Sequence, residues 1–256
     1  MRTIAFVPAA PDERAVLLSV ARALDLRVVI GSDPHAALVM AWDPRARRAP
    51  FCASSGVRVV NADCVDVSKT FVARVFERNA GSALLVDPLR HVGAMVAKSD
   101  ENGTHDGEVL FGPLYGCSRT KVYQRLVDNR CGDDQVEDLR VAVCGSSLPL
   151  VYRKRRPVAT RFDNRNAEVH LESEAFLRSH EAELVRAVAA DLGMDYGEVD
   201  LLRDRRDGTA WIVDANPTPW GPPNGLAVPE RARAITLLAQ AFERVFLSRH
   251  DRSSSA

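Results

Sequence analysis

The segment IVDANPTPWGPPNG, residues 212–225, places a carboxylate and an amide two residues apart where an apolar stretch ends. Side chains alternate along a strand, so Asp214 and Asn216 are expected to point to the same face. If the hairpin before them has a five-residue connection, Asp200 lies opposite Asp214 and shares that face. Such oxygen ligands suit Mg²⁺ when nucleotide phosphates complete its shell. The alternative is a polar hairpin with an Asx turn before Pro217.

A second group of residues could bind phosphate. The strand-like run VGAMVAK ends in Lys98 and leads into the polar loop SDENGTHDG, residues 99–107. Gly103 and Gly107 would let backbone N–H groups approach phosphate oxygens closely, above one fixed lysine charge. The patterns GxxxxGK[ST] and GxGxxG are absent from the sequence. A solvated surface turn, with His105 as a bystander, is the alternative.

Basic residues occupy two further strand-like segments. VYRKRRPVATR contains four consecutive cations: Arg153, Lys154, Arg155 and Arg156. Only every second one can face a given side of a strand. In EDLRVAVCG, Arg140 is flanked by apolar residues, and a buried guanidinium needs a partner. That partner is either Asp138 or Glu137, or else a carboxylate or phosphoryl group of a substrate.

The segment VYQRLVDN, residues 122–129, combines an apolar strand with Gln124 and Asp128. An exposed strand edge offers backbone N–H and C=O groups that can bind an adenine ring. Asp128 would then accept hydrogen bonds from ribose hydroxyls. The alternative is an ordinary strand with a polar end.

The elements that must position these residues are strands in consecutive runs with helices between them. Strands are predicted at 2–9, 27–31, 37–42, 92–98, 108–116, 121–129, 137–145 and 148–154, and in a hairpin over 197–216. Helices are predicted at 12–26, 68–81, 172–193 and 229–247. This arrangement favours an α+β or mixed α/β fold over a regular βαβ series.

Composition excludes several functional classes. The 256 residues contain 34 Lys and Arg against 34 Asp and Glu, so bulk electrostatics would not hold nucleic acid. No run approaches the roughly 18 apolar residues that span a bilayer, and the N-terminus lacks the apolar core of a secretory signal. The five cysteines are scattered without a CxxC pair. They predict reduced thiols in a cytoplasmic protein rather than a zinc site.

The order of these pieces resembles the ATP-grasp superfamily over most of residues 61–225. MVAKSDENGTHDG looks like the family's lysine strand and phosphate-covering loop, and VYQRLVD like its hinge. VEDLRVAVCG resembles the D-x-R-v-x-v-x-G strand of its amino-acid-adding ligases. DYGEVDLLRDRRDGTAWIVDANPTPW looks like its magnesium-binding end. NADCVDVSKTFVARVF resembles its lead-in, with Lys69 in place of the first nucleotide-contacting lysine.

The resemblance implies an ATP-grasp fold, in which two α+β subdomains clasp ATP after a small N-terminal α/β unit. The expected boundaries are 1–62 for the N-terminal unit, 63–122 for the central subdomain and 123–248 for the C-terminal subdomain. Residues 249–256 are expected to form a disordered tail.

The resemblance also implies a role for each matching residue. Nucleotide contacts are expected from Lys69, Lys98, Gly103, His105, Asp106, Gly107, Gln124, Leu126 and Asp128. The catalytic cations would be Arg140, Lys154 and Arg156, and one or two Mg²⁺ ions would be held by Asp200, Asp214 and Asn216. Two positions depart from the family pattern: Gln124 stands where many members carry glutamate, and Asp214 where glutamate is commoner.

The activity that the resemblance implies is ATP-dependent joining of a carboxylate to an amine through an acyl phosphate. Arg140 would stabilise the tetrahedral oxyanion, and closure of loop 99–107 would exclude water. The partners would be a small carboxylate and an amine, such as amino acids or a peptide, with no nucleic acid or membrane; a homodimer is left open. The alternatives are a small-molecule kinase of the same fold or a non-catalytic nucleotide-binding protein. Trp220 either packs on a substrate or fills the core.

Overall fold

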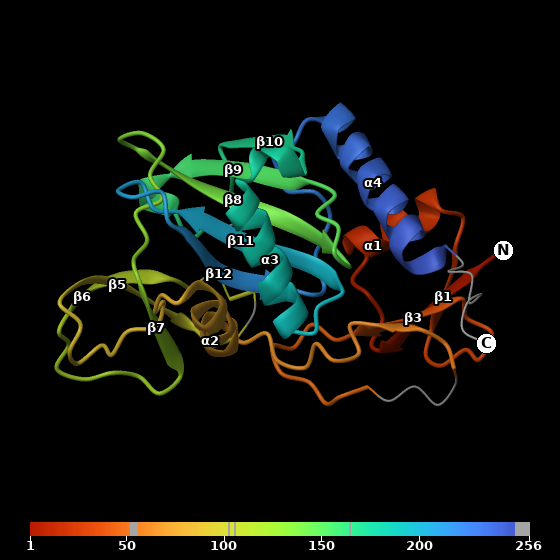
Figure 1. Cartoon of the computed structure of the whole chain (residues 1–256), viewed down its shortest axis with the longest axis horizontal. Coiled ribbons are helices and arrows are strands. Elements are labelled where there is room, and N and C mark those ends of the chain that lie inside the picture. The colour runs from red at the N-terminus through yellow and green to blue at the C-terminus, as the bar shows by residue number, and fades with distance from the viewer. Residues whose placement is uncertain (52–55, 102, 105, 164, 249–256) are drawn as a thin grey trace.

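The computed structural model describes residues 1–51, 56–101, 103–104, 106–163 and 165–248. Within these residues the chain forms three sheets with helices packed against them (Figure 1). The architecture is mixed α/β, as predicted. The predicted nucleotide contact His105 and the tail 249–256 lie outside the described residues.

The N-terminal unit is a parallel sheet of order β2-β1-β3-β4. Its strands are β1 (Thr3–Pro8), β2 (Arg27–Ile30), β3 (Leu38–Trp42) and β4 (Val59–Val60). The near-continuous apolar runs of β1 and β3 are typical of buried parallel strands. Helix α1 (Val16–Ala23) begins later than predicted, because Asp12 accepts hydrogen bonds from the Arg14 backbone and side chain in a turn before it.

The middle of the chain forms helix α2 and a small antiparallel sheet of order β6-β5-β7. Ser68 caps α2 (Lys69–Ala80) by accepting from the backbone N–H of Phe71, and Gly81 ends it with a φ of 66°. The strands are β5 (Gly93–Ser99), β6 (Glu108–Gly112) and β7 (Lys121–Arg125). β7 spans both sides of the boundary expected at 122–123.

The large sheet is antiparallel, with order β10-β9-β8-β11-β12. Its strands are β8 (Gln135–Cys144), β9 (Val151–Pro157), β10 (Glu168–Glu172), β11 (Tyr196–Arg203) and β12 (Ala210–Asn216). A short turn of helix, η1 (Val158–Thr160), follows β9. One face is apolar and packs with α2 and α3 in a single core. The other face carries the charged side chains described below.

The helix predicted from residue 172 is shorter in the structure. Glu172 pairs with Val151 at the end of β10, a strand that was not predicted, and a short helical turn η2 (Glu174–Phe176) follows. Helix α3 (Ser179–Asp191) then begins seven residues later than expected. Pairing with β9 places Glu172 in the sheet, and the residues that follow form the short turn η2 before α3 begins.

The last helix returns to the N-terminal unit. α4 (Val228–Phe242) continues as a π-helical turn η3 (Glu243–Leu247) and packs on α1 (Figure 1). The ring of Phe242 lies edge-on to that of Tyr196, with 5.7 Å between centroids, so α4 also contacts the large sheet. Among the described residues, none of the helices has the length and apolar character needed to cross a membrane.

Candidate active site

The two acids of the hairpin face each other, as predicted. Asp200 on β11 lies opposite Asp214 on β12, and Glu198 lies opposite Asn216 on the same face. The connection is longer than the predicted five residues, because Arg203 already pairs with Ala210. An extra residue at the β12 bulge, Val213, restores the pairing. Its carbonyl accepts a hydrogen bond from Lys98 Nζ at 3.2 Å, so the bulge also links the two sheets.

Arg140 binds Asp200, and not the neighbours in its own strand. Its Nε and Nη2 donate to the two Asp200 oxygens, each at 2.8 Å. The predicted local partners are wrong, because β11 lies beside β8 and brings Asp200 directly opposite Arg140. Burial lowers the pKa of Arg140, but the charge and hydrogen bonds of Asp200 outweigh this and raise it. Burial alone would raise the pKa of Asp200, and the Arg140 charge instead holds it well below its usual range.

Glu198 belongs to the same charged face, and the sequence prediction missed it. The residue is 6% exposed, and its carboxylate lies 3.6 Å from Arg140 Nε. Burial raises its pKa to about 7, although the Arg140 charge opposes the shift. Side-chain alternation places Asp214 and Asn216 on one face of their strand, and it places Glu198 and Asp200 on one face in the same way. The sequence spacing therefore already indicated that Glu198 belongs to this face.

The four consecutive cations of β9 divide between two faces, as alternation requires. Lys154 and Arg156 share the face of Arg140. Lys154 is 4% exposed and lies 3.3 Å from Asp200, whereas Arg156 pairs with Asp138. Arg153 and Arg155 point the other way and pair with glutamates: Glu172 at 3.0 Å and Glu137 at 2.8 Å. Burial lowers the pKa of Lys154, with a further contribution from the charge of Arg140.

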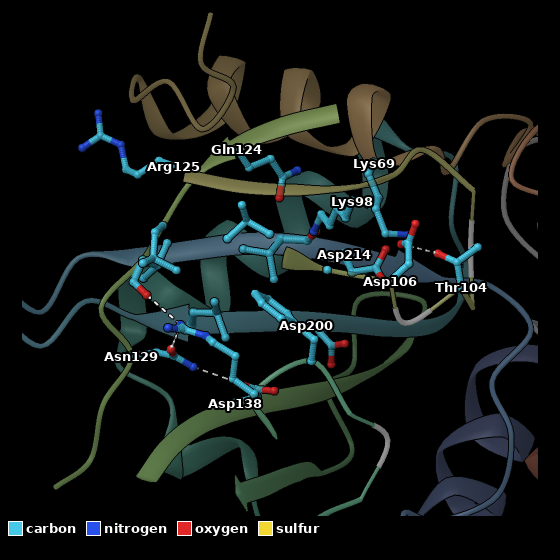
Figure 2. A pocket seen from close by; sticks show the side chains of 18 of the residues that line it. Lys69, Lys98, Thr104, Asp106, Gln124, Arg125, Asn129, Asp138, Asp200 and Asp214 are labelled. Carbon is cyan, nitrogen blue, oxygen red and sulfur yellow. Dashed lines mark hydrogen bonds between the residues drawn. The ribbon is translucent and has the colours of Figure 1, made fainter. Parts of the chain in front are cut away.

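A cavity lies between the small sheet and the charged face of the large sheet. In Figure 2, Lys69, Lys98 and Gln124 reach it from α2, β5 and β7, while Asp200 and Asp214 reach it from β11 and β12. The Lys69 Nζ donates to the Glu101 carbonyl at 2.6 Å. Burial lowers the pKa of Lys98 to about 8, against the raising effect of Asp214. Two ammonium groups and two carboxylates thus converge on one volume.

The loop after β5 covers this cavity. Asp106 holds the loop together by accepting from the Ser99 backbone N–H at 3.0 Å and from the Thr104 hydroxyl at 2.9 Å. Gly107 packs flat against Phe162, since a Cβ at this position would lie 2.7 Å from the Phe162 ring. The loop and the segment after β9 therefore meet across the cavity mouth.

Gln124 and Leu126 lie at the hinge between the two sheets. Gln124 is 2% exposed and lines the cavity, and its Nε2 has no hydrogen-bond partner within the described residues. A buried amide donor without a partner is costly unless a ligand supplies an acceptor. The Leu126 backbone lines the same cavity, and no backbone hydrogen bond to it is found in the described part of the chain. This combination fits the edge of a heterocyclic base.

Two residues predicted to bind ligands instead make local hydrogen bonds outside the cavity. Asp128 does not line the cavity, and its carboxylate binds Arg130 through two contacts of 2.7 Å. Asn216 Oδ1 accepts from the Thr218 backbone at 3.0 Å, which is the Asx turn that was the alternative interpretation. In place of Asp128, Asn129 lines the cavity, where it donates to Asp138 at 2.8 Å.

The acidic residues fit a magnesium ion only if phosphates complete its shell. Among the described residues, no group of three His, Cys, Asp or Glu side chains is arranged to hold a metal by itself. Asp200 and Asp214 line one cavity from facing positions. Mg²⁺ is commonly held by one or two carboxylates together with nucleotide phosphates. Asp214 has no ion pair within the described residues, whereas both Asp200 oxygens accept from Arg140, so Asp200 would bind a metal only by sharing its oxygens with that guanidinium.

A second cavity adjoins the first, and four residues line both: Asp138, Arg156, Asp200 and Asp214. Its other lining residues come from β8 and β9, the segment after β9, the start of α1 with the residues before it, the proline-rich exit of β12 and the start of α4. Trp220 is 48% exposed and lines this cavity, with the Arg14 guanidinium 3.7 Å from its ring centroid. It lies at a cavity mouth and not in the core. Arg140 and Lys154 face the same volume.

Comparisons by sequence find no matching family model and no matching curated protein. Solved structures do match. The ATP-grasp ligase PsnB in complex with a minimal precursor has a TM-score of 0.60 and 15% identity, over 95% of this chain and 99% of that chain. A RiPP-associated ATP-grasp ligase from Chryseobacterium gregarium, with ADP and a leader and core peptide, has a TM-score of 0.56 and 11% identity, over 96% and 97%.

D-alanine–D-alanine ligase from Bacillus anthracis in complex with ATP has a TM-score of 0.53 and 10% identity, over 96% of this chain and 97% of that chain. At these identities the likeness concerns the fold. The chain has the ATP-grasp fold along nearly its whole length, which confirms the architecture that the sequence resemblance implied.

Proposed function

We propose that this protein is an ATP-dependent ligase that joins a carboxylate to an amine. The observation that carries the proposal is the pair of adjoining cavities with shared acidic walls. The first offers two lysines and an unpartnered buried amide, Gln124, which suit phosphates and a base. The second offers Arg140 and Lys154, which suit a reacting carboxylate. A phosphoryl group could pass between them beside Asp200 and Asp214.

The reaction would proceed in two steps. A carboxylate oxygen of the substrate attacks the γ-phosphorus of ATP, the bond to ADP breaks, and an acyl phosphate forms. The amine then attacks the acyl carbon to form a tetrahedral intermediate and loses a proton. The C–O bond to the phosphoryl group breaks, and inorganic phosphate leaves with the former carboxylate oxygen. Lys69 and Lys98 would bind the phosphates, and Arg140 would stabilise the oxyanion of the second step. A magnesium ion held by Asp200 and Asp214 would neutralise charge on the phosphates.

The loop over the nucleotide cavity supports such chemistry. An acyl phosphate must be protected from water, and the Gly107–Phe162 contact covers the nucleotide cavity. Related folds bind peptides: the PsnB structure contains a precursor, and the Chryseobacterium gregarium enzyme a leader and core peptide. We therefore propose an amino acid or a peptide as the class of substrate for this protein. A cytoplasmic location, where ATP and reduced thiols are found, belongs to the same proposal.

Nucleotide binding tests the proposal directly. We expect AMPPNP to bind the full chain only in the presence of Mg²⁺, and Asp214→Ala to weaken binding at least about tenfold, since one of two facing carboxylates is removed. Asp133→Asn, at an exposed acid distant from the cavities, should bind like the wild type. Calorimetric titration measures each affinity. Equal affinity with and without Mg²⁺, or in Asp214→Ala, contradicts the proposal.

Product analysis separates ligation from its closest alternative. A panel of amino acids and peptides is incubated in pairs with ATP and Mg²⁺, and free phosphate and substrate masses are recorded. A ligase releases one phosphate for each amide formed. A kinase leaves the phosphoryl group on its substrate, and that outcome would replace the ligase assignment.

A further inference from the structure

The back wall of the second cavity is built from the two ends of the chain. Glu13, Arg14 and Ser19 contribute from the α1 side, and Arg231 and Ile235 from α4. The α1 side is fastened to the exit of β12, because the Val16 N–H donates to the Pro219 carbonyl at 3.2 Å and the Gly221 N–H to the Arg14 carbonyl at 2.7 Å. This wall faces the cations on the large sheet across the cavity.

Nearly every cation in this cavity already has an acidic partner. Arg140 and Lys154 bind Asp200, and Arg156 binds Asp138. Arg14 binds Asp12 at 2.9 Å. Arg231 is the exception: within the described residues its guanidinium has no ion pair and no hydrogen bond, and the residue is half-buried. A guanidinium without an acidic partner can bind a carboxylate through two parallel hydrogen bonds.

The cavity carries charges of both signs, since Glu13 and Asp163 line it with the acids already named, and the position of Arg231 favours an anion locally. Arg231 lies in the first turns of α4, where the helix dipole contributes further positive potential. Arg231 and Arg140 line the same cavity from two walls, Arg231 from α4 and Arg140 from β8.

We propose that Arg231 binds an acidic group of the substrate, distinct from the carboxylate that is activated. The inference rests on the proposed function and narrows its substrate class to amino acids or peptides with an additional carboxylate. Such a group could belong to a free amino acid or to a glutamate or aspartate of a peptide. Arg231 is a specificity-determining residue in this scheme, and it takes no part in phosphoryl transfer.

The test measures binding to the full chain saturated with AMPPNP and Mg²⁺. The probes are free L-glutamate and L-glutamine, and two blocked tripeptides that differ only by Glu or Gln at the central position. We expect the acid of one pair to bind about tenfold more tightly than its amide. The free and blocked pairs distinguish an amino acid from a peptide as the source of the carboxylate.

Arg231→Met keeps an unbranched apolar side chain and removes the guanidinium and its charge. It should abolish the preference for the acid and leave AMPPNP affinity unchanged. Arg233→Met is the matched control, because Arg233 is exposed on the same helix and does not line the cavity. Absence of an acid preference in the wild type, or an equal loss for acid and amide in Arg231→Met, overturns the inference. Failure of AMPPNP to bind the wild type would instead overturn the proposed function.

Discussion

The side-chain amide of Gln124 links the stability of the hinge to ligand binding. It is 2% exposed, and its Nε2 donates to no partner within the described residues. An unsatisfied buried donor costs about 1–3 kcal/mol. A nucleotide base would satisfy this donor, so the cost is recovered only in the complex.

Gln124→Leu should therefore separate stability from binding. We expect the free energy of unfolding to stay equal or rise by about 1 kcal/mol, while AMPPNP affinity falls about tenfold. Urea unfolding and calorimetric titration measure the two quantities. A destabilised variant with unchanged nucleotide affinity would mean that Gln124 is a structural residue.

For individual residues, the sequence predicted relative positions correctly where one strand or one hairpin determines the geometry. The facing of Asp200 and Asp214 is confirmed, although the connection is one residue longer than predicted and the extra residue Val213 compensates for it. The partner of Arg140 could not be found in this way. It depends on β11 lying next to β8, which are separated by about 60 residues of chain, as the Arg140–Asp200 hydrogen bond shows. Only the strand order gives that information.

One buried acid of helix α3 adds an ion pair to the apolar contacts that hold this helix on the sheet. Glu181 is fully buried; its carboxylate binds Arg203 on β11 at 2.7 Å and accepts from the Arg178 N–H at the helix start. Burial raises the pKa of Glu181, but the bonds from Arg203 and Arg178 outweigh it and hold the pKa below its usual value. The stabilisation is therefore present above the unfolded-state pKa and is lost as the pH falls through the folded-state pKa.

Glu181→Gln should lower the free energy of unfolding at pH 7 by about 2–4 kcal/mol, because Arg203 loses its charged partner. The difference from the wild type should narrow as the pH falls below about 4. Urea unfolding at several pH values measures this dependence. Glu183→Gln, at an exposed position of the same helix, should change the free energy by less than about 0.5 kcal/mol. A pH-independent difference for Glu181→Gln would exclude the ion pair as its cause.

The same region shows why element boundaries were harder to predict than element types. The acidic and apolar residues from 172 onward have helical spacing, yet Glu172 pairs with Val151 as the end of β10. An edge strand gains its hydrogen bonds from a neighbour that local periodicity cannot identify. The predicted helix is present as α3, but it begins at Ser179, because Glu172 belongs to β10 and η2 lies between the two elements.

At the scale of the whole molecule, the substrate side of the site depends on how the N-terminal unit is attached to the large sheet. α1 and α4 pack together and wall the second cavity, while α2 and α3 cover the opposite face of the large sheet (Figure 1). The sequence predicted the small N-terminal unit but gave no sign that the last helix returns to it. That contact joins residues near the two ends of the chain.

Asn61 fastens the N-terminal unit to β11. It is fully buried with a φ of 61°, a left-handed conformation that asparagine tolerates better than most residues. Its side chain donates to the Tyr196 carbonyl and accepts from the Tyr196 N–H, each at 2.8 Å. Its backbone N–H donates to the Asp195 carboxylate at 2.7 Å. One residue thus positions β11 relative to the first sheet.

Asn61→Ala should lower the free energy of unfolding by about 2–4 kcal/mol, because both backbone groups of Tyr196 lose a buried partner and alanine disfavours a positive φ. Asn61→Gly relieves the backbone strain alone and should recover less than half of the loss. Urea unfolding measures both, with Asn224→Ala at an exposed site as the control. Hydrogen exchange should accelerate in β4 and β11, because Asn61 directly follows β4 and binds Tyr196 at the start of β11. A loss below about 1 kcal/mol with unchanged exchange would show that the packing of α1 on α4 suffices to hold the unit in place.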